Sequence, residues 1–426
     1  MKALPLLATP RLVVLVGDPK AEFLNDLGIE TIAYEDLLCE GLPDLDRPDV
    51  DERNAAILCH TGGTTGLPKG IAYSHRSLWL QATSLCTNNS LGIGASDSVF
   101  PVVPMFHVNA WGLPFAAAIA GAKLILPGAA LRPETVADLV ASEQPTILAG
   151  VPTIWTDLLA FLGDRAADAL RSVRLLATGG TFVTPTLIET FNGLGINVVQ
   201  AWGMTETSSM STISNVPPWA ETSAEKFDYA TGQGRVVAGL EVRVVDADGA
   251  PLPADGLQVG EIQIRGPWVT SSYFLHDDPD KFQDGWLKTG DLGKLDCDGF
   301  VFLSDRLKDA IKSGGEWIPS PALESAIQAK GGFREVAVIA VPDDRWQERP
   351  LAVVVLAAPN EKVDLQAIAG QLDSQIPRWW IPINWIVVES IPRTGMGKFD
   401  KKKMREMFSA GTLGDVQIIL PGQPGR

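Results

Sequence analysis

One loop of the sequence combines the residue types that can hold a polyphosphate. Residues 60–70 read His-Thr-Gly-Gly-Thr-Thr-Gly-Leu-Pro-Lys-Gly and lie between the apolar stretches 55–58 and 71–73. The glycines allow backbone N–H groups to turn inward at positive φ, the threonines supply hydroxyl donors, and Lys69 supplies positive charge. The loop is not a Walker A motif, because its third glycine is followed by Leu-Pro rather than by Lys and Ser or Thr. A threonine-rich hairpin turn is the alternative, but the combination favours phosphate binding.

The composition sets limits on the class of protein. A chain of 426 residues is longer than one ordinary core, so two or three domains or subdomains are expected. A hydrophobic content of 46% with 41 Gly and 30 Pro is typical of a loop-rich α/β enzyme. The formal net charge of −16 argues against a nucleic-acid partner, and no apolar run approaches the roughly 18 residues of a membrane span. The four cysteines lack metal-ligand spacing, which predicts reduced thiols in a cytoplasmic protein. The oligomeric state is left open, a homodimer included.

Strands alternate with helices through the first half of the chain. Helical patterns separate five buried-strand patterns, at 99–104, 121–126, 146–150, 173–177 and 197–201. This alternation predicts an α/β fold with a mainly parallel sheet covered by helices and functional loops at the carboxyl ends of the strands. His107, Gly179-Gly180 and the segment Trp202–Glu206 are therefore expected on one rim of the sheet.

The pattern changes after about residue 235. Short alternating strands between Asp, Gly and Pro turns predict a small antiparallel or barrel-like β subdomain up to residue 304. The charged segment 305–309 predicts a hinge, and the helices and strands beyond it predict a compact α+β domain with a basic helix at 398–407. The predicted organisation is an N-terminal domain of residues 1–304, the hinge, and a mobile C-terminal domain of residues 310–426.

Six stretches resemble the motifs of the adenylate-forming, or AMP-binding, superfamily. Its phosphate loop is usually an aromatic residue followed by Thr-Ser-Gly-Thr-Thr-Gly-x-Pro-Lys-Gly, which residues 60–70 match at all but two places. The other five matches are Trp202-Gly203-Met204-Thr205-Glu206, Gly285–Asp291, Asp305–Asp309, Ser313–Glu316 and Pro392–Lys398. Their order is the order of the family, which argues strongly against coincidence. The stretch Met105–Trp111 resembles fatty-acid and related acyl-CoA ligases in particular.

The resemblance implies ATP, Mg²⁺ and coenzyme A as cofactors. The nucleotide-binding residues of the phosphate loop would be Thr61, Gly63, Thr64, Thr65, Gly66 and Lys69. Among them Thr64, Thr65 and Lys69 would hold the β and γ phosphates. Glu206 would bind Mg²⁺ through a hard carboxylate oxygen, with Thr205 beside it in the catalytic set. A solvated loop glutamate is the alternative for Glu206.

The adenosine moiety would contact a second group of residues. Trp202 stands where the family usually has Tyr and would offer its face to adenine, although a core tryptophan is the alternative. Asp291 would accept hydrogen bonds from both ribose hydroxyls. Arg306 would contact the ribose or a phosphate, with a surface Asp-Arg pair as the alternative. The remaining members of this group are Gly180, Thr181 and Gly203.

The C-terminal motifs imply roles in both half-reactions. Lys398 would bridge the acid and the α-phosphate in the transition state, although solvated charge beside the lysines of 401–403 is the alternative. Lys308 occupies the hinge position, about which the C-terminal domain would rotate before a thiol attacks the adenylate. Gly314 and Gly315 would let the backbone approach the pantetheine channel of CoA.

The resemblance also narrows the acid. Amino-acid-activating relatives need an Asp near the position of His107, and none is present. The expected substrate is therefore a small-molecule carboxylic acid with an uncharged fatty, short-chain or aryl tail. His107 would act as a gate beside the carboxylate, because a carboxylate needs no general base at pH 7.

Three departures from the family pattern keep other hypotheses open. Gly62 replaces the usual Ser, His60 replaces the usual aromatic residue, and only residues 1–59 precede the loop, which implies a shortened N-terminal subdomain. An acid–CoA ligase is the first hypothesis. The second is an adenylating enzyme that uses a carrier-protein thiol, an amine or an inorganic nucleophile. The third is a non-catalytic, truncated paralogue that binds nucleotide.

Overall fold

The computed structural model describes residues 12–16, 30–39, 49–61, 68–128, 131–181, 183–246, 248–314, 316–358, 363–374, 376–393 and 399–419. The chain divides into two compact units, Met1–Asp51 and Glu52–Arg426. In the described part of the first unit, β1 (Leu12–Leu15) and β2 (Glu30–Ala33) pair in parallel, and α1 (Tyr34–Cys39) follows. The second unit contains every site residue that the sequence predicts.

The predicted phosphate loop joins the two strands of a hairpin. β3 (Ala55–Thr61) and β4 (Lys69–Ser74) pair antiparallel, and Thr61 lies opposite Lys69 where the loop begins and ends. Residues 62–67 lie outside the described residues. The Ser74 hydroxyl caps α2 (His75–Leu85) by accepting a 3.1 Å hydrogen bond from the backbone N–H of Ser77, as its residue type predicts.

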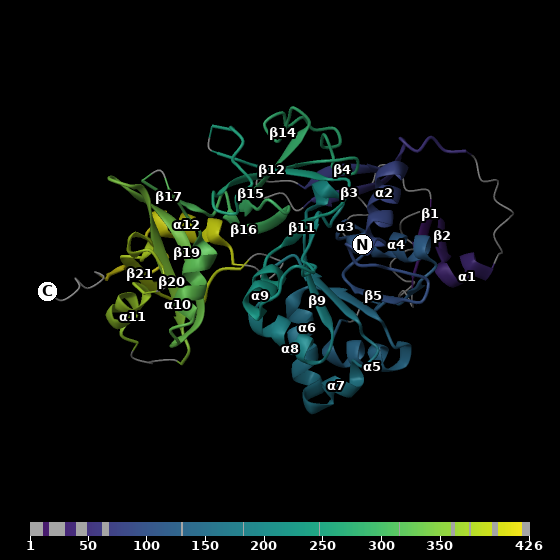
Figure 1. Ribbon diagram of the computed structural model, residues 1–426, viewed down its shortest axis with the longest axis horizontal. Coiled ribbons are helices and arrows are strands. Elements are labelled where there is room, and N and C mark those ends of the chain that lie inside the picture. The colour runs from purple at the N-terminus through teal and green to yellow at the C-terminus, as the bar shows by residue number, and fades with distance from the viewer. Residues whose placement is uncertain are drawn as a thin grey trace. The chain divides into compact units, whose positions relative to one another are not determined.

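A twelve-stranded sheet forms the centre of the second unit (Figure 1). Its parallel part runs in the order β6-β5-β7-β8-β9 and consists of β5 (Ser98–Val102), β6 (Lys123–Leu124), β7 (Ile147–Gly150), β8 (Leu175–Gly179) and β9 (Asn197–Trp202). Every residue of β7 and β8 is buried, as in parallel strands covered on both faces. This confirms the predicted parallel sheet.

Helices cover both faces of the parallel strands. Leu148 and Leu176 pack with α5 (Pro133–Glu143), α6 (Pro152–Leu162) and α8 (Pro185–Gly193) in one core. The next residues along the same strands, Ala149 and Ala177, pack with α2 and with α4 (Leu113–Ala120) in another. The short α7 (Ala166–Ala169) follows α6. None of the helices in the described part of the chain has the length and apolar character that a membrane crossing requires.

Antiparallel strands continue the same sheet. β10 (Thr212–Ile213) pairs antiparallel with both β9 and β11 (Gly234–Val236), and α9 (Ser223–Thr231) lies between β10 and β11 in the chain. The remaining strands are β12 (Glu241–Val245), β13 (Gly260–Arg265), β14 (Phe282–Gln283), β15 (Trp286–Leu295) and β16 (Phe300–Arg306). The predicted antiparallel strands are confirmed, and β16 extends to Arg306, inside the predicted hinge.

The C-terminal part contains a second sheet of six strands. Its strands are β17 (Ile311–Ser313), β18 (Glu316–Ile318), β19 (Phe333–Asp343), β20 (Gln347–Leu356), β21 (Asn384–Val387) and β22 (Gln417–Ile418). Its helices are α10 (Ser320–Gln328), α11 (Leu365–Leu372) and α12 (Lys401–Ser409). The predicted α+β character is confirmed. The predicted start of the last helix at residue 398 is wrong, because the Asp400 carboxylate caps the helix by accepting from the Lys403 N–H at 2.9 Å.

A mostly buried ion pair joins α10 to α12. Lys401 Nζ lies 2.6 Å from Glu324 Oε1 and donates to the Ser320 hydroxyl at 2.7 Å, and Ser320 in turn donates to Asp305 at 2.7 Å. Burial raises the pKa of Glu324 and of Asp305, and the Lys401 ammonium opposes both shifts. The two carboxylates therefore depend on Lys401 for compensation of their charge.

Lys401→Met is expected to reduce the free energy of unfolding by about 3 kcal/mol at neutral pH, because it leaves buried carboxylates unpaired. Without the cation their pKa values rise further in the folded state. The deficit should shrink as the pH falls towards 4.5, the usual value for Glu, because the proton then binds in both states. Urea unfolding at several pH values measures this. Lys402→Met is the matched control, since Lys402 is exposed, and a deficit of equal size there would contradict the assignment.

Candidate active site

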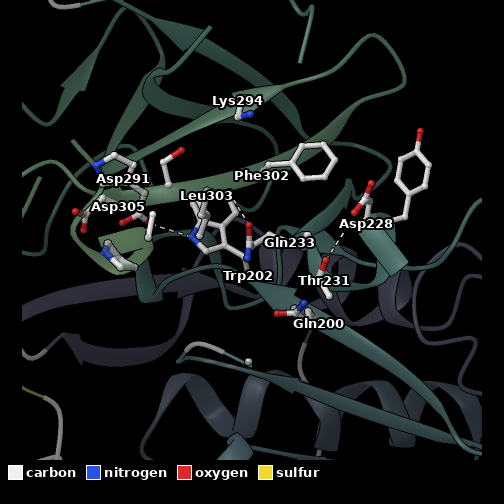
Figure 2. A pocket seen from close by; sticks show the side chains of 18 of the residues that line it. Gln200, Trp202, Asp228, Thr231, Gln233, Asp291, Lys294, Phe302, Leu303 and Asp305 are labelled. Carbon is white, nitrogen blue, oxygen red and sulfur yellow. Dashed lines mark hydrogen bonds between the residues drawn. The ribbon is translucent and has the colours of Figure 1, made fainter. Parts of the chain in front are cut away.

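A cavity of about 920 Å³ lies at the carboxyl ends of β8 and β9. Its wall also includes parts of α9, β15, β16 and α10. Six residues predicted to contact the nucleotide line it together: Gly180, Thr181, Trp202, Gly203, Asp291 and Arg306. Figure 2 shows Trp202 beside Asp291 within this cavity. The structure therefore brings the predicted adenosine-binding group into one place, on the rim where the strand pattern predicts functional loops.

Asp291 is held at the centre of this group. The Trp202 Nε1–H donates to Asp291 Oδ2 at 2.8 Å, and Arg306 Nε lies 2.6 Å from Oδ1. The antiparallel register of β15 and β16 places Asp291 opposite Arg306. The carboxylate is only 2% exposed, and burial raises the pKa of Asp291 although Arg306 and Trp202 oppose the shift.

One oxygen of Asp291 fits a nucleotide ribose. The close approach of Arg306 to Oδ1 is an ion pair without hydrogen-bond geometry, and this buried oxygen accepts no hydrogen bond from any residue that the structure describes. A buried carboxylate oxygen without a donor is costly, and a ribose hydroxyl is a suitable donor. The donor set therefore fits the ribose that the sequence predicts for Asp291.

Trp202 has a contact that the sequence does not predict. The side chain is 7% exposed and packs in the core beneath the cavity, so part of the core-tryptophan alternative is correct. Its edge holds Asp291, and the residue also lines the cavity. Stacking of its face on adenine stays a prediction. The sequence gives one signal for the contact with Asp291. Trp carries an indole N–H donor, whereas the usual Tyr carries a hydroxyl at the end of its ring.

Gly203 is required by a close approach of two backbone segments. A Cβ atom at this position would lie 1.4 Å from the Ser209 carbonyl oxygen. The chain folds back tightly here because the Ser211 N–H donates to the Trp202 carbonyl at 2.7 Å. Thr205 and Glu206 follow in a short 3₁₀ turn, Thr205–Thr207, which begins two residues after the cavity-lining Gly203.

Glu206 is a buried carboxylate in that turn. It is 6% exposed, and its Oε1 accepts a 2.7 Å hydrogen bond from the Tyr273 hydroxyl. It forms no ion pair with any residue that the structure describes. The Thr205 carbonyl beside it accepts from the Tyr73 hydroxyl. A buried carboxylate without an ion-pair partner among the described residues fits a hard cation, and Mg²⁺ is often held by one carboxylate together with phosphate oxygens and water. The residues present therefore fit the predicted metal.

Lys69 lies beside Tyr273, the residue that contacts Glu206. Its Nζ forms a 2.7 Å ion pair with Asp278 Oδ2, and the Lys69 ammonium holds the pKa of Asp278 below its usual range. The ammonium also lies 4.6 Å from the centre of the Tyr273 ring. Thr61 is its partner across the hairpin. The other predicted phosphate-binding residues, Gly63, Thr64, Thr65 and Gly66, lie outside the described residues and stay predictions.

His107 precedes a left-handed turn. Val108, Asn109, Ala110, Trp111 and Gly112 all have positive φ, between 50° and 76°. For residues other than Gly this conformation costs roughly 1–2 kcal/mol each. Buried contacts hold the turn, because the Trp111 carbonyl accepts from both the Ser209 hydroxyl and the Gln81 amide, at 2.8 and 3.4 Å. His107 itself is exposed at the start of this turn. Its predicted role as a gate is not tested by this geometry.

The predicted hinge residues contact both parts of the second unit. Asp305 accepts from Ser320 of α10, and Asp309 pairs with Arg405 of α12 at 3.1 Å. Between them Arg306 pairs with Asp291 of β15. Lys308 is exposed in the turn that follows β16.

Three further C-terminal predictions stay untested by the geometry. Gly314 has a φ of +62°, and a Cβ there would lie 2.8 Å from the Trp346 ring. This explains the glycine on conformational grounds alone. Gly315 and Lys398 lie outside the described residues, so their roles towards CoA and the α-phosphate stay predictions.

Sequence reasoning missed three polar residues of the segment before β14. Tyr273 and Asp278 contact Glu206 and Lys69, and Lys281 Nζ donates to the Thr289 carbonyl at 3.2 Å. Burial lowers the pKa of Lys281. These residues belong to no recognised motif, and their partners lie far away in the chain. The single available signal is a short run of acidic and aromatic residues between two predicted strands.

Comparisons with known proteins agree with these motifs. The chain matches the family model "AMP-binding enzyme" over residues 2–274 and "AMP-binding enzyme C-terminal domain" over residues 322–398. The medium-chain-fatty-acid–CoA ligase of Ectopseudomonas oleovorans is 42% identical over 381 residues, 88% of this chain and 69% of that protein. The 3-methylmercaptopropionyl-CoA ligase of Ruegeria lacuscaerulensis is 40% identical over 406 residues, 94% of this chain and 74% of that protein.

A solved structure shows the same architecture. The o-succinylbenzoate–CoA synthetase of Bacillus subtilis, in complex with ATP and magnesium ion, superposes with a TM-score of 0.74 at 26% sequence identity. The superposition covers 93% of this chain and 79% of that chain. Since a family model matches well over half of the sequence and the relatives match most of it, this chain belongs to the AMP-binding enzyme family, whose acyl-CoA ligases its motifs resemble.

Proposed function

We propose that this chain joins a carboxylic acid to coenzyme A in two steps, adenylation of the acid with release of pyrophosphate and then formation of the thioester. The observation that carries the proposal is the buried Asp291 carboxylate in the cavity, which Trp202 and Arg306 hold. Its Oδ1 forms an ion pair with Arg306 but accepts no hydrogen bond from a described residue, so it suits a ribose hydroxyl as donor. The named activities of both relatives are CoA ligations, which favours CoA as the acceptor.

The first step is an in-line attack of the carboxylate oxygen on the α-phosphorus, with cleavage of the bond to pyrophosphate. Two anions must meet, so the residues have to position them and offset their charge. Lys69, Thr64 and Thr65 would hold the outer phosphates, and Lys398 would bridge the acid and the α-phosphate. Glu206 would hold Mg²⁺, which would neutralise part of the charge of the phosphates when bound.

The second step is attack of the CoA thiol sulfur on the acyl carbon, with AMP as the leaving group. Lys308 would be the pivot for a rotation of residues 310–426 against residues 1–304, and Gly314 and Gly315 would border the pantetheine. The roles of these three residues come from the family motifs, and the domain boundaries come from the strand pattern and the charged segment of the sequence. The contacts of residues 305–309 with both parts of the unit support a pivot in this segment.

The acid substrate is expected to have an uncharged tail. A Cβ at Gly180 would lie 3.7 Å from Val151 Cγ1 and 4.0 Å from Trp111 Cζ2, so apolar groups border the cavity beside the adenosine-binding group. The acids named for the two relatives, a medium-chain fatty acid and 3-methylmercaptopropionate, have uncharged tails as well. We therefore propose a fatty, short-chain or aryl acid, with His107 as a gate beside its carboxylate.

Release of pyrophosphate tests the proposal. The protein is incubated with ATP, Mg²⁺ and a panel of fatty, short-chain and aryl acids, each with and without CoA, beside samples that lack the acid or contain EDTA. The expected result is release that requires both acid and Mg²⁺, with acyl-CoA as the product when CoA is present.

The same experiment separates the alternatives. Acid-dependent release without any acyl-CoA would indicate another acceptor, such as a carrier-protein thiol, an amine or an inorganic nucleophile. No release with any acid, from protein with a cooperative unfolding transition, would favour a non-catalytic nucleotide-binding paralogue. The presence of Glu206, Asp291, Arg306 and Lys398 together favours the catalytic alternative, because drift in a non-catalytic paralogue would be expected to replace at least one of them.

The cellular setting is proposed on composition alone. The net charge of −16 and the scattered cysteines support a cytoplasmic protein without a nucleic-acid partner. A homodimer stays open, and light scattering on the purified protein measures it directly.

A further inference from the structure

Residues 267–281, between β13 and β14, connect two parts of the candidate site, the turn that carries Glu206 and the hairpin that carries the phosphate loop. The backbone N–H of Thr270 donates to the Glu206 carbonyl at 2.8 Å. The backbone N–H of Phe274 donates to the Gly70 carbonyl, next to Lys69, at 2.7 Å. The segment is therefore attached at one point to the turn that carries Glu206 and at another to the hairpin that carries the phosphate loop.

One side chain of this segment contacts both functional groups. Tyr273 is 7% exposed, its hydroxyl donates to Glu206 Oε1 at 2.7 Å, and its ring faces Lys69 Nζ at 4.6 Å. Asp278 holds the same ammonium from another direction, at 2.7 Å. Phe282 packs edge-on against the Tyr273 ring with 5.2 Å between the ring centres, which restricts its orientation.

We propose that Tyr273 is a positioning residue, which orients Glu206 for Mg²⁺ through its hydroxyl and holds Lys69 for the phosphates through its ring. The inference rests on the proposed function, because it concerns the approach of Mg–ATP to the same site.

The two contacts of Tyr273 are a hydrogen bond to Glu206 and a cation–π interaction with Lys69. The hydroxyl donates to Glu206 Oε1 and would leave Oε2 for the metal, and loss of such a hydrogen bond to a metal ligand typically weakens metal binding about 10–100-fold. A tyrosine hydroxyl, with a usual pKa of about 10, is a donor at neutral pH. The ring attracts the Lys69 cation without neutralising it, and an ammonium has three donors, of which Asp278 takes one.

Two substitutions of the same residue separate these contacts. Tyr273→Phe removes the hydroxyl and keeps the ring, whereas Tyr273→Leu removes both. Tyr73→Phe is the matched control, because the Tyr73 hydroxyl is also buried and also contacts the Thr205–Thr207 turn, but through the Thr205 carbonyl rather than the Glu206 carboxylate. All three variants are first compared with the parent protein by thermal unfolding without nucleotide.

The measurement is the rise in unfolding temperature that ATP produces as Mg²⁺ is increased, with no acid present. Tyr273→Phe is expected to raise the half-saturating Mg²⁺ concentration at least about tenfold and to leave the ATP affinity at saturating Mg²⁺ within about twofold. Tyr273→Leu is expected to weaken ATP a further three- to tenfold or so at saturating Mg²⁺. Tyr73→Phe should leave both quantities as in the parent protein.

If Tyr273→Phe had the same half-saturating Mg²⁺ concentration as the parent protein, the inference would be overturned. It would also be overturned if Tyr73→Phe raised this concentration as much as Tyr273→Phe does. This readout needs ATP and Mg²⁺ but no turnover. If no acid supports pyrophosphate release yet the Tyr273 variants show the expected shifts, the proposed ligase activity fails while the positioning role stands. If release occurs and the shifts are absent, the positioning role fails alone.

Discussion

Asp291→Asn is expected to lower kcat/KM for ATP about 10²- to 10³-fold. Asp291 is the group expected to accept hydrogen bonds from both ribose hydroxyls, and hydrogen bonds to a charged group contribute about 1.5–3 kcal/mol each. The amide retains the shape of the side chain but presents two N–H donors on one side, so at most one good acceptor remains. Steady-state kinetics and calorimetric titration with ATP measure the loss.

Asp291→Asn should not lower the stability of the protein, although it lowers the activity. Burial raises the pKa of Asp291, which means that the charged carboxylate is costly in the folded protein. Asn removes that cost, so the unfolding temperature is expected to be equal or higher. The raised pKa of Asp291 also predicts how ATP affinity depends on pH in the parent protein. ATP affinity should fall as the pH decreases through the raised pKa, at a higher pH than for an ordinary aspartate.

Asp284→Asn is the matched control for Asp291→Asn. Asp284 is exposed at the beginning of the β15 hairpin with a φ of +51°, a conformation that Asn tolerates as well as Asp. Its kinetics and stability are expected to be those of the parent. Unchanged ATP affinity in Asp291→Asn, with Asp284→Asn also unchanged, would contradict the ribose assignment.

Gly203→Ala is expected to reduce the free energy of unfolding by at least about 4 kcal/mol. The added Cβ would lie 1.4 Å from the Ser209 oxygen and 2.5 Å from the Ser209 carbonyl carbon. These are backbone atoms, which cannot rotate away as the end of a side chain can. The turn that follows must shift, and it carries Glu206. Urea unfolding measures the stability, and a variant that no longer folds would show no cooperative transition.

Gly193→Ala provides the comparison for that substitution. Gly193 is the last residue of α8, and no heavy atom lies within 4 Å of a Cβ built there. In a helix Ala is favoured over Gly by about 1 kcal/mol, so this variant should be equally or slightly more stable. If Gly203→Ala behaved like Gly193→Ala, the close approach at Gly203 would not be a constraint on the fold.

The sequence predicts the parts of the fold that have a strong local signal. β7 and the first three residues of β8 are continuous apolar runs, so the sequence alone predicts that these strands are buried on both faces. The sequence does not predict β15, because this strand contains Gly290 and Asp291, residues of weak strand propensity. Its pairing with β13 and β16 outweighs that weak propensity. α9 was missed despite a capping box between Thr222 and Glu225.

The site divides in the same way. Motifs give residue types and order, so Asp291 and Glu206 could be predicted with roles from the family resemblance. The contacts that hold them could not. Trp202 and Asp291 are separated by 89 positions, Glu206 and Tyr273 by 67, and Lys69 and Asp278 by 209. No periodic pattern spans such separations, because tertiary folding alone brings the partners together.

The pairing of Arg306 with Asp291 has a consequence for energy coupling. The carboxylate that would accept the ribose is also the anchor of a residue in the segment 305–309, and the Leu307 N–H bonds to the Gly290 carbonyl beside it at 2.9 Å. A ribose hydroxyl on Asp291 Oδ1 would therefore compete with Arg306 for the same oxygen. Suppose that displacement of Arg306 changes the affinity for the nucleotide by a given factor. Nucleotide binding must then change the equilibrium between the paired and the displaced Arg306 by the same factor, because the two equilibria are linked. Nucleotide binding in the cavity and the position of residues 305–309 are therefore coupled by a single free energy.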